Sequence, residues 1–163
     1  MFTFDINDLS TMKINPDLLT FLWPYNTNIQ ELTLQIRHFV VENIPQTNEL
    51  IWDNYNAVAI AYSKSDKLKD AFCHIAVYKS HVNFGFNRGV ELSDSPIAML
   101  GKGKLIRHIS VTNFESFPVI DIKKMLTEAI KLSEKLNTSL VQPDIRSASI
   151  VMSISKNKIR PTN

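Results

Sequence analysis

The sequence predicts an α+β domain in which an antiparallel sheet of about five strands is flanked by helices. Two long segments carry apolar residues at helical spacing, and between them the apolar period falls from 3.6 residues to 2. The strand-like segments are joined by short polar connections, which suit hairpins but not the crossovers of a dozen residues that parallel strands need. With 163 residues, the chain has the length of a single compact domain.

Three segments have the features of helices. The strongest patterns predict helices over Ile29–Asn43 and Val119–Leu136, and a shorter helix is expected around Pro16–Trp23. Overlapping capping-box patterns that begin at Thr27 and Asn28 mark the start of the Ile29–Asn43 helix. Both longer segments have an apolar stripe, so we expect them to pack on the sheet.

A change to a period of two residues predicts the strands, and the later ones have one more apolar and one more polar face. The predicted strands are Glu49–Asn54, Ala57–Tyr62, Ala71–Tyr78, His81–Asn87 and Lys104–Val111. Residues 147–155 alternate as well, beyond the second long helix. We therefore expect residues 1–145 to form the α+β domain and residues 146–163 to form a basic C-terminal segment. That segment would be an extra edge strand, a strand exchanged with a second subunit, or a tail.

Charge is unevenly distributed along the chain. The whole sequence has 18 basic and 16 acidic residues, a net charge of +2. Residues 1–50 carry six acidic and two basic side chains, whereas residues 137–163 carry one acidic and four basic. The small total argues against a protein that coats a polyanion, so nucleic acid is not an expected partner, but a local anion site is compatible with the distribution.

The remaining composition bears on compartment and cofactor. No basic and apolar leader begins the sequence, and no apolar run approaches the roughly 18 residues of a membrane span, so we expect a cytoplasmic protein without a membrane partner. The single cysteine, Cys73, excludes an internal disulfide and a cysteine-based zinc site. Its strand face is otherwise Ala, Ile and Val, which predicts a buried and inert thiol. The four histidines show no metal-ligand spacing, so no cofactor is expected.

One face of each later strand is more polar than the other. The polar faces hold His74, His81, Asn83, Asn87, Lys104 and His108. These side chains would converge if the last two strands of the meander are neighbours in the sheet. Gly85 lies within a strand, where a missing Cβ either marks a twist or bulge or lets a ligand approach the backbone.

The densest basic run is Gly101–His108. Backbone amides of such a loop, with Lys102, Lys104 and Arg107, could hold a phosphate or carboxylate, and the alternative is a flexible loop with solvated lysines. The spacing of a Walker A loop is absent. The residues expected to line a ligand site are Asn56, Asn87, Arg88, Lys104, Arg107 and His108. No catalytic residue is assigned, because no nucleophile or carboxylate accompanies the histidines in sequence.

The segment Glu49–Ile60, with its Asp-Asn-Tyr-Asn stretch, resembles small bacterial domains of unknown function in the YdhG-like family. Leu100–Gly103 and Arg107–Ile109 are similar to further segments of that family in the same order, so that the resemblance covers residues 30–160. It implies a compact α+β domain with an antiparallel sheet. Some of these relatives are described as frataxin-like iron chaperones, which implies carboxylate-rich iron binding, whereas the acidic residues are scattered here.

The sequence thus favours a non-enzymatic cytoplasmic domain that binds a small anionic ligand or a protein partner. A homodimer is left open by the C-terminal segment. The alternative that the resemblance implies is a frataxin-like protein that binds or delivers iron inside the cell.

Overall fold

The computed structural model describes residues 12–44, 46–93, 95–141 and 147–161. The expectation about a leader and the boundary expected at residue 145 both fall outside these ranges. Within them, no helix combines the length and the apolar character needed to cross a bilayer.

The described residues form three α-helices and six strands, as the α+β prediction requires. The helices are α1 (Pro16–Leu22), α2 (Thr27–Asn43) and α3 (Val119–Leu136). The strands are β1 (Asn48–Asp53), β2 (Val58–Ser63), β3 (Ala71–Val77), β4 (Val82–Phe86), β5 (Arg107–Val111) and β6 (Ser149–Ile154). Short 3-10 turns at Leu68–Asp70, Gly89–Glu91, Phe114–Ser116 and Thr138–Leu140 complete the connections.

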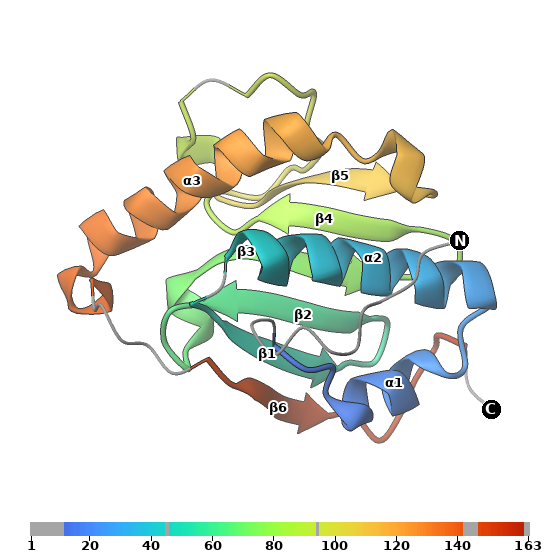
Figure 1. Cartoon of the computed structure of the whole chain (residues 1–163). Coiled ribbons are helices and arrows are strands. Elements are labelled where there is room, and N and C mark those ends of the chain that lie inside the picture. The colour runs from blue at the N-terminus through green and yellow to red at the C-terminus, as the bar shows by residue number, and fades with distance from the viewer. Residues whose placement is uncertain (1–11, 45, 94, 142–146, 162–163) are drawn as a thin grey trace.

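All six strands belong to one sheet, in the order β5-β4-β3-β2-β1-β6. Strands β1 to β5 form an antiparallel meander, and the chain then passes through α3 to place β6 parallel to β1 at the far edge. In Figure 1, the helices lie in front of the sheet and β6 lies below β1. Strands β4 and β5 are neighbours, which the sequence had left open, and this pairing brings their polar faces together.

The helices cover one face of the sheet, and the main hydrophobic core lies between them. Alternate residues of the central strands face this core, among them Tyr62, Ile75 and Phe84, which are at most 1% exposed. Cys73 is also completely buried there, and burial raises the pKa of its thiol well above the ordinary value, as expected for an inert thiol. The other face of the sheet carries no described helix (Figure 1), and we call it the open face.

Part of the open face is apolar. Leu50 and Ala61 are cross-strand neighbours on this face, yet they are no more than 3% exposed. Trp52 and Ile150 pack over them and form a second, smaller hydrophobic cluster. The β1, β2 and β6 side of the open face is therefore covered by its own side chains, whereas the β3, β4 and β5 side carries polar residues.

Most boundaries shift by one or two residues from the sequence prediction, and two differences have a clear physical reason. Asn26, not Thr27 or Asn28, caps α2, since its side chain accepts a hydrogen bond from the backbone N–H of Ile29 at 2.9 Å. Strand β5 begins at Arg107 rather than at Lys104. Residues 104–106 belong instead to a loop that Arg107 itself holds, as described below.

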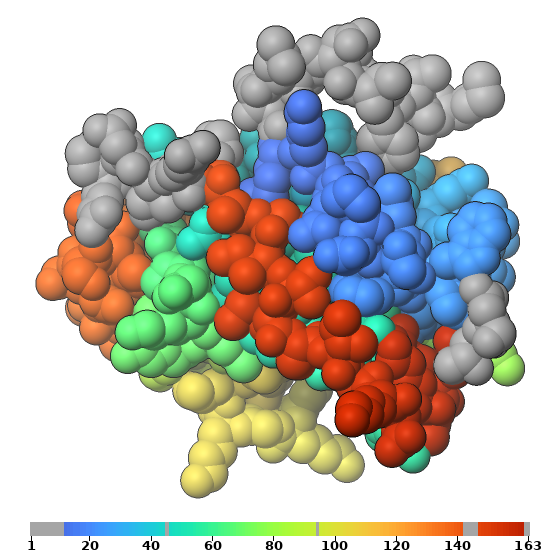
Figure 2. Space-filling view, turned by 90° about the horizontal axis from the view of Figure 1, so that it is seen from below, coloured from blue at the N-terminus to red at the C-terminus, as the bar shows by residue number. Residues whose placement is uncertain are grey.

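The C-terminal segment forms edge strand β6 and then a strap across the end of β1. Backbone bonds join Ser155 to Asp53 and Ile159 to Tyr55, and the buried carboxylate of Asp53 forms ion pairs with Lys158 and Arg160. In Figure 2, this red segment crosses the middle of the view, beside the blue α1 region. The last three residues of β6 are exposed, so their burial contributes little to holding this end of the chain. The ion pairs and backbone bonds hold the strap instead.

Candidate functional site

Polar side chains of β3, β4 and β5 meet on the open face. The register pairs His74 with Gly85 and Gly85 with His108, so the two histidines flank a glycine in one row across the sheet. The next row pairs Asn83 with Ser110. Together with Asn87, which follows β4, these residues are the polar patch: His74, Asn83, Gly85, Asn87, His108 and Ser110.

The ring of His74 is held in one orientation. Its Nδ1 lies 3.0 Å from Oδ1 of Asn87, and because that oxygen can only accept, Nδ1 carries the hydrogen and Nε2 keeps a free lone pair. The ring lies over Gly85, where an added Cβ would be only 2.6 Å from Cε1 and Nε2 of His74. The group that lies close to the Gly85 backbone is thus a side chain of the protein rather than a ligand, and the strand pairing shows no bulge at this position.

The environment of His74 keeps its imidazole neutral. Burial lowers its pKa below the ordinary value of 6.5, and the nearby His108 lowers it further, while the bond to Asn87 acts in the opposite direction. At neutral pH, His74 therefore presents Nε2 as a hydrogen-bond acceptor.

Asn83 provides a second acceptor. Its Oδ1 is buried and has no hydrogen-bond partner among the described residues. A buried polar atom without a partner costs free energy, so such atoms are rare in folded proteins and point to an occupant. The patch thus has two acceptors, His74 Nε2 and Asn83 Oδ1, that are suited to donors on a bound molecule.

The basic loop before β5 stands beside the patch. Leu100 and His108 exchange two backbone hydrogen bonds of 2.7 and 2.9 Å, which fold the loop back along β5. Gly101 has φ 131°, a conformation that glycine adopts at little cost. Figure 2 shows the helices in the upper part and the yellow loop region projecting below the sheet, on the open side. Lys102 and Lys104 are exposed in this loop.

The predicted site residues are only partly brought together. Asn87 and His108 belong to the patch, and Lys104 lies in the adjacent loop. Arg107 shares the helix-covered face with its partner Phe86, and its Nη1 donates to the backbone oxygens of Gly103 and Ile106 at 2.8 and 2.7 Å. Arg107 therefore shapes the loop, and these bonds occupy the Nη1 donors that were expected to hold an anion.

Two other predicted site residues, Arg88 and Asn56, do not contribute to the patch, and neither does His81, which the sequence placed on a polar strand face. Arg88 forms a two-bond ion pair with Glu91 at 2.5 and 2.7 Å, which neutralises its charge. Asn56 lies in the β1–β2 turn and His81 in the β3–β4 turn, both at the opposite end of the sheet. At 3.3 Å per residue, His81 is about 7 Å along the strand from Asn83, the nearest patch residue, and about 20 Å from Asn87. His81 stacks there on Tyr78.

The sequence placed His74 and Asn83 on a polar strand face but did not select them for the site. Their signal was the alternation of β3 and β4, which became decisive only with the register. Nothing in the sequence indicates the Asn87 bond or the unpartnered Oδ1 of Asn83, since both depend on side-chain placement.

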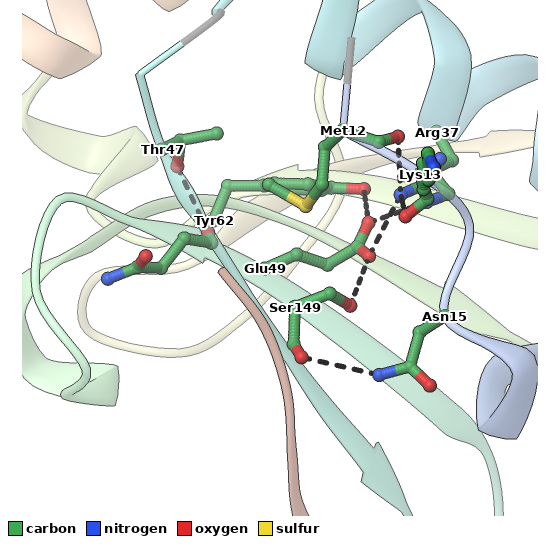
Figure 3. Close-up of polar contacts among 9 residues, drawn as sticks. Met12, Lys13, Asn15, Arg37, Thr47, Glu49, Tyr62 and Ser149 are labelled. Carbon is green, nitrogen blue, oxygen red and sulfur yellow. Dashed lines mark hydrogen bonds and ion pairs between the residues drawn. The ribbon is translucent and has the colours of Figure 1, made fainter. Parts of the chain in front are cut away.

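A charged cluster on the helix-covered face was missed as well. Figure 3 shows the carboxylate of Glu49, which is fully buried, between three donors. Arg37 donates through Nε and Nη2 at 2.7 and 3.1 Å, Tyr62 through its hydroxyl at 3.0 Å, and Ser149 through its hydroxyl at 2.7 Å. Burial and the charge of Glu49 raise the pKa of Tyr62, so the phenol remains a donor. Nη2 of Arg37 also donates to the backbone oxygens of Met12 and Lys13. Because protein groups supply all four bonds to Glu49, the cluster joins α2, β1, β2 and β6 and is closed to a ligand.

A different hollow, of about 720 Å³, lies between α2 and α3. Its lining includes Phe39, Val119 and Ile120, and Ile120 is 71% exposed. This hollow lacks an unpartnered buried polar atom among the described residues. For metals, no three His, Cys, Asp or Glu side chains in the described ranges are grouped so as to hold an ion.

Comparison with protein-family models, curated proteins and solved structures gives no match.

Proposed function

We propose that this chain is a binding domain that holds a small anionic ligand on the open face of its sheet. The observation that carries the proposal is the polar patch, in which the buried Oδ1 of Asn83 has no described partner and Nε2 of His74 keeps a free lone pair, beside a basic loop. None of the six patch residues is acidic, so a negative charge meets no repulsion there.

The patch and the loop have complementary parts. His74 Nε2 and Asn83 Oδ1 accept hydrogen bonds, so they require hydroxyl or N–H groups on the ligand. Lys102 and Lys104 supply positive charge for a phosphate or carboxylate. The ligand therefore carries donors at one end and a negative charge at the other.

Binding without catalysis is the function that these residues support. A neutral histidine with a free Nε2 suits a general base, but no carboxylate or cysteine accompanies it within the patch. The iron-chaperone alternative rests on the YdhG-like resemblance alone.

The test is a titration with ribose 5-phosphate, which combines hydroxyl donors with a phosphate. We expect NMR shift changes centred on His74, Asn83 and His108. The double variant Lys102→Gln/Lys104→Gln should weaken binding about two- to tenfold, because exposed charges contribute modestly. Lys123→Gln/Lys124→Gln on α3 makes the same charge change outside the patch and should bind like the parent protein.

Two results would overturn the proposal. One is the absence of shift changes with ribose 5-phosphate and inorganic phosphate up to millimolar concentrations. The other is an equal loss of binding in both lysine variants, which would show attraction by net charge rather than a site.

A further inference from the structure

The open face continues beyond the polar patch into a low apolar surface. The row of Asn83 runs through Ala76 on β3 and Ala59 on β2 to Trp52 on β1. Both alanines are partly exposed, as is Trp52. The two smallest apolar side chains therefore form a floor between an indole and an amide, and we call Ala59 and Ala76 the alanine floor.

From this row we infer that the ligand carries a planar heteroaromatic ring with an N–H donor, and that the ring lies on the alanine floor between Trp52 and Asn83. This inference rests on the proposed function, because the patch and the basic loop fix where the anionic group goes. It deepens that function by naming the ligand class as a ring-bearing anion.

The shape and chemistry of the row from Trp52 to Asn83 indicate that the ligand carries a ring. Methyl side chains let a flat group approach the sheet closely, and the partly exposed indole of Trp52 offers an aromatic partner at one side. Unlike Leu50 and Ala61, which Trp52 and Ile150 cover, Ala59 and Ala76 remain accessible.

The N–H donor is indicated by Asn83. Its Oδ1 is the buried acceptor without a described partner, and it lies in the strand next to Ala76. A ring on the floor would present its edge to the Asn83 amide, and because Oδ1 is buried in the free chain, the amide would turn so that this oxygen meets a donor on that edge.

The spacing of the strands fixes the overall form of the ligand. Strands lie about 4.8 Å apart, so β2 and β5 are roughly 14 Å apart across the sheet. The basic loop stands beyond β5, on the open side (Figure 2). The ligand is therefore extended, with the ring and the anionic group at opposite ends.

The experiment compares the binding of adenosine 5′-monophosphate, phenyl phosphate and ribose 5-phosphate to the Trp23→Phe variant. In this variant Trp52 is the only tryptophan, so it reports binding by its fluorescence. Trp23 is 68% exposed on the α1 side, so its replacement should leave the fold intact. We expect the nucleotide to quench Trp52 and to bind about tenfold more tightly than ribose 5-phosphate. Phenyl phosphate, which has a ring but no N–H donor, should fall between them.

Ala76→Leu fills the floor and should remove the advantage of the nucleotide while ribose 5-phosphate still binds. Ala148→Leu adds the same volume at an exposed position beside β6 and should change neither affinity. If the nucleotide and ribose 5-phosphate bind equally, the ring is refuted and the proposed function stands. If phenyl phosphate equals the nucleotide, the N–H donor is refuted. If none of the three binds, the inference and the proposed function both fail.

Discussion

Loss of the Arg37 guanidinium is expected to destabilise the protein strongly. Arg37 and Glu49 are 3% and 0% exposed, and the carboxylate receives two of its four hydrogen bonds from the arginine. Removing one partner of such a buried pair costs about 3–5 kcal/mol, because the other charge is left buried. The hydroxyls of Tyr62 and Ser149 still solvate Glu49, so we expect Arg37→Met to lose about 3 kcal/mol of unfolding free energy, at the lower end of that range.

Urea unfolding with a constant m-value measures this loss, which should lower the melting temperature by about 10 °C for a chain of this length. Arg88→Met is the matched control, because Arg88 forms a similar two-bond pair with Glu91 at the surface and should barely move the urea midpoint. A double-mutant cycle of Arg37→Met with Glu49→Gln should show clear coupling. A loss below about 1 kcal/mol for Arg37→Met, or additive effects in the cycle, would refute the view that the pair is buried and coupled.

Three further predictions concern the polar patch. Gly85→Ala should destabilise the protein by about 1–2 kcal/mol and shift the NMR signals of the His74 ring, because the new Cβ would overlap that ring at 2.6 Å; unchanged signals would contradict the packing. The pKa of His74 is lowered in the folded protein, so the unfolded chain takes up the proton first and the unfolding free energy should fall as the pH drops below about 6.5. His74→Gln should reduce the difference between the urea midpoints measured at pH 7.5 and 5.5. An equal difference in the parent protein and the variant would contradict this prediction. Asn83→Val removes the acceptor without a described partner and should raise stability by about 1 kcal/mol in urea while weakening ribose 5-phosphate binding; a loss of stability would show that Oδ1 is satisfied in solution.

Much of the fold could be predicted because its signals are local. The bounds expected for the last long helix, Val119–Leu136, are those of α3. Short connections imposed antiparallel neighbours on the meander, and alternation assigned each side chain to a face. The pairing that brings His108 beside β4 was left open by the sequence, because residues 87–106 separate the two strands.

The errors arose where a side chain satisfies distant or unusual backbone groups. Alternation extended β5 back to Lys104, but Arg107 donates to backbone oxygens within residues 103–106, and those residues form a loop instead. Asn56 was grouped with Asn87 by residue type, although the β1–β2 turn lies at the other end of the sheet. The partners of Glu49 lie 12 and 100 residues away in sequence, so no local pattern indicated that its carboxylate is buried.

The buried carboxylates on one face of the sheet have partners, whereas a buried acceptor on the other face has none in the part of the chain that the structure describes, and this difference favours the open face as the site. On the helix-covered face, Glu49 and Asp53 are buried, and cations from α2 and the C-terminal strap neutralise them. On the open face, His74 Nε2 has a free lone pair and Asn83 Oδ1 has no partner among the described residues, although an unsatisfied buried acceptor costs about 1–3 kcal/mol. The fold neutralises its buried carboxylates but leaves the cost of an unsatisfied acceptor in the polar patch. The folded protein therefore gains stability when a ligand supplies the donors. The stability increase expected for Asn83→Val and the loss of binding expected with it are therefore two consequences of one arrangement.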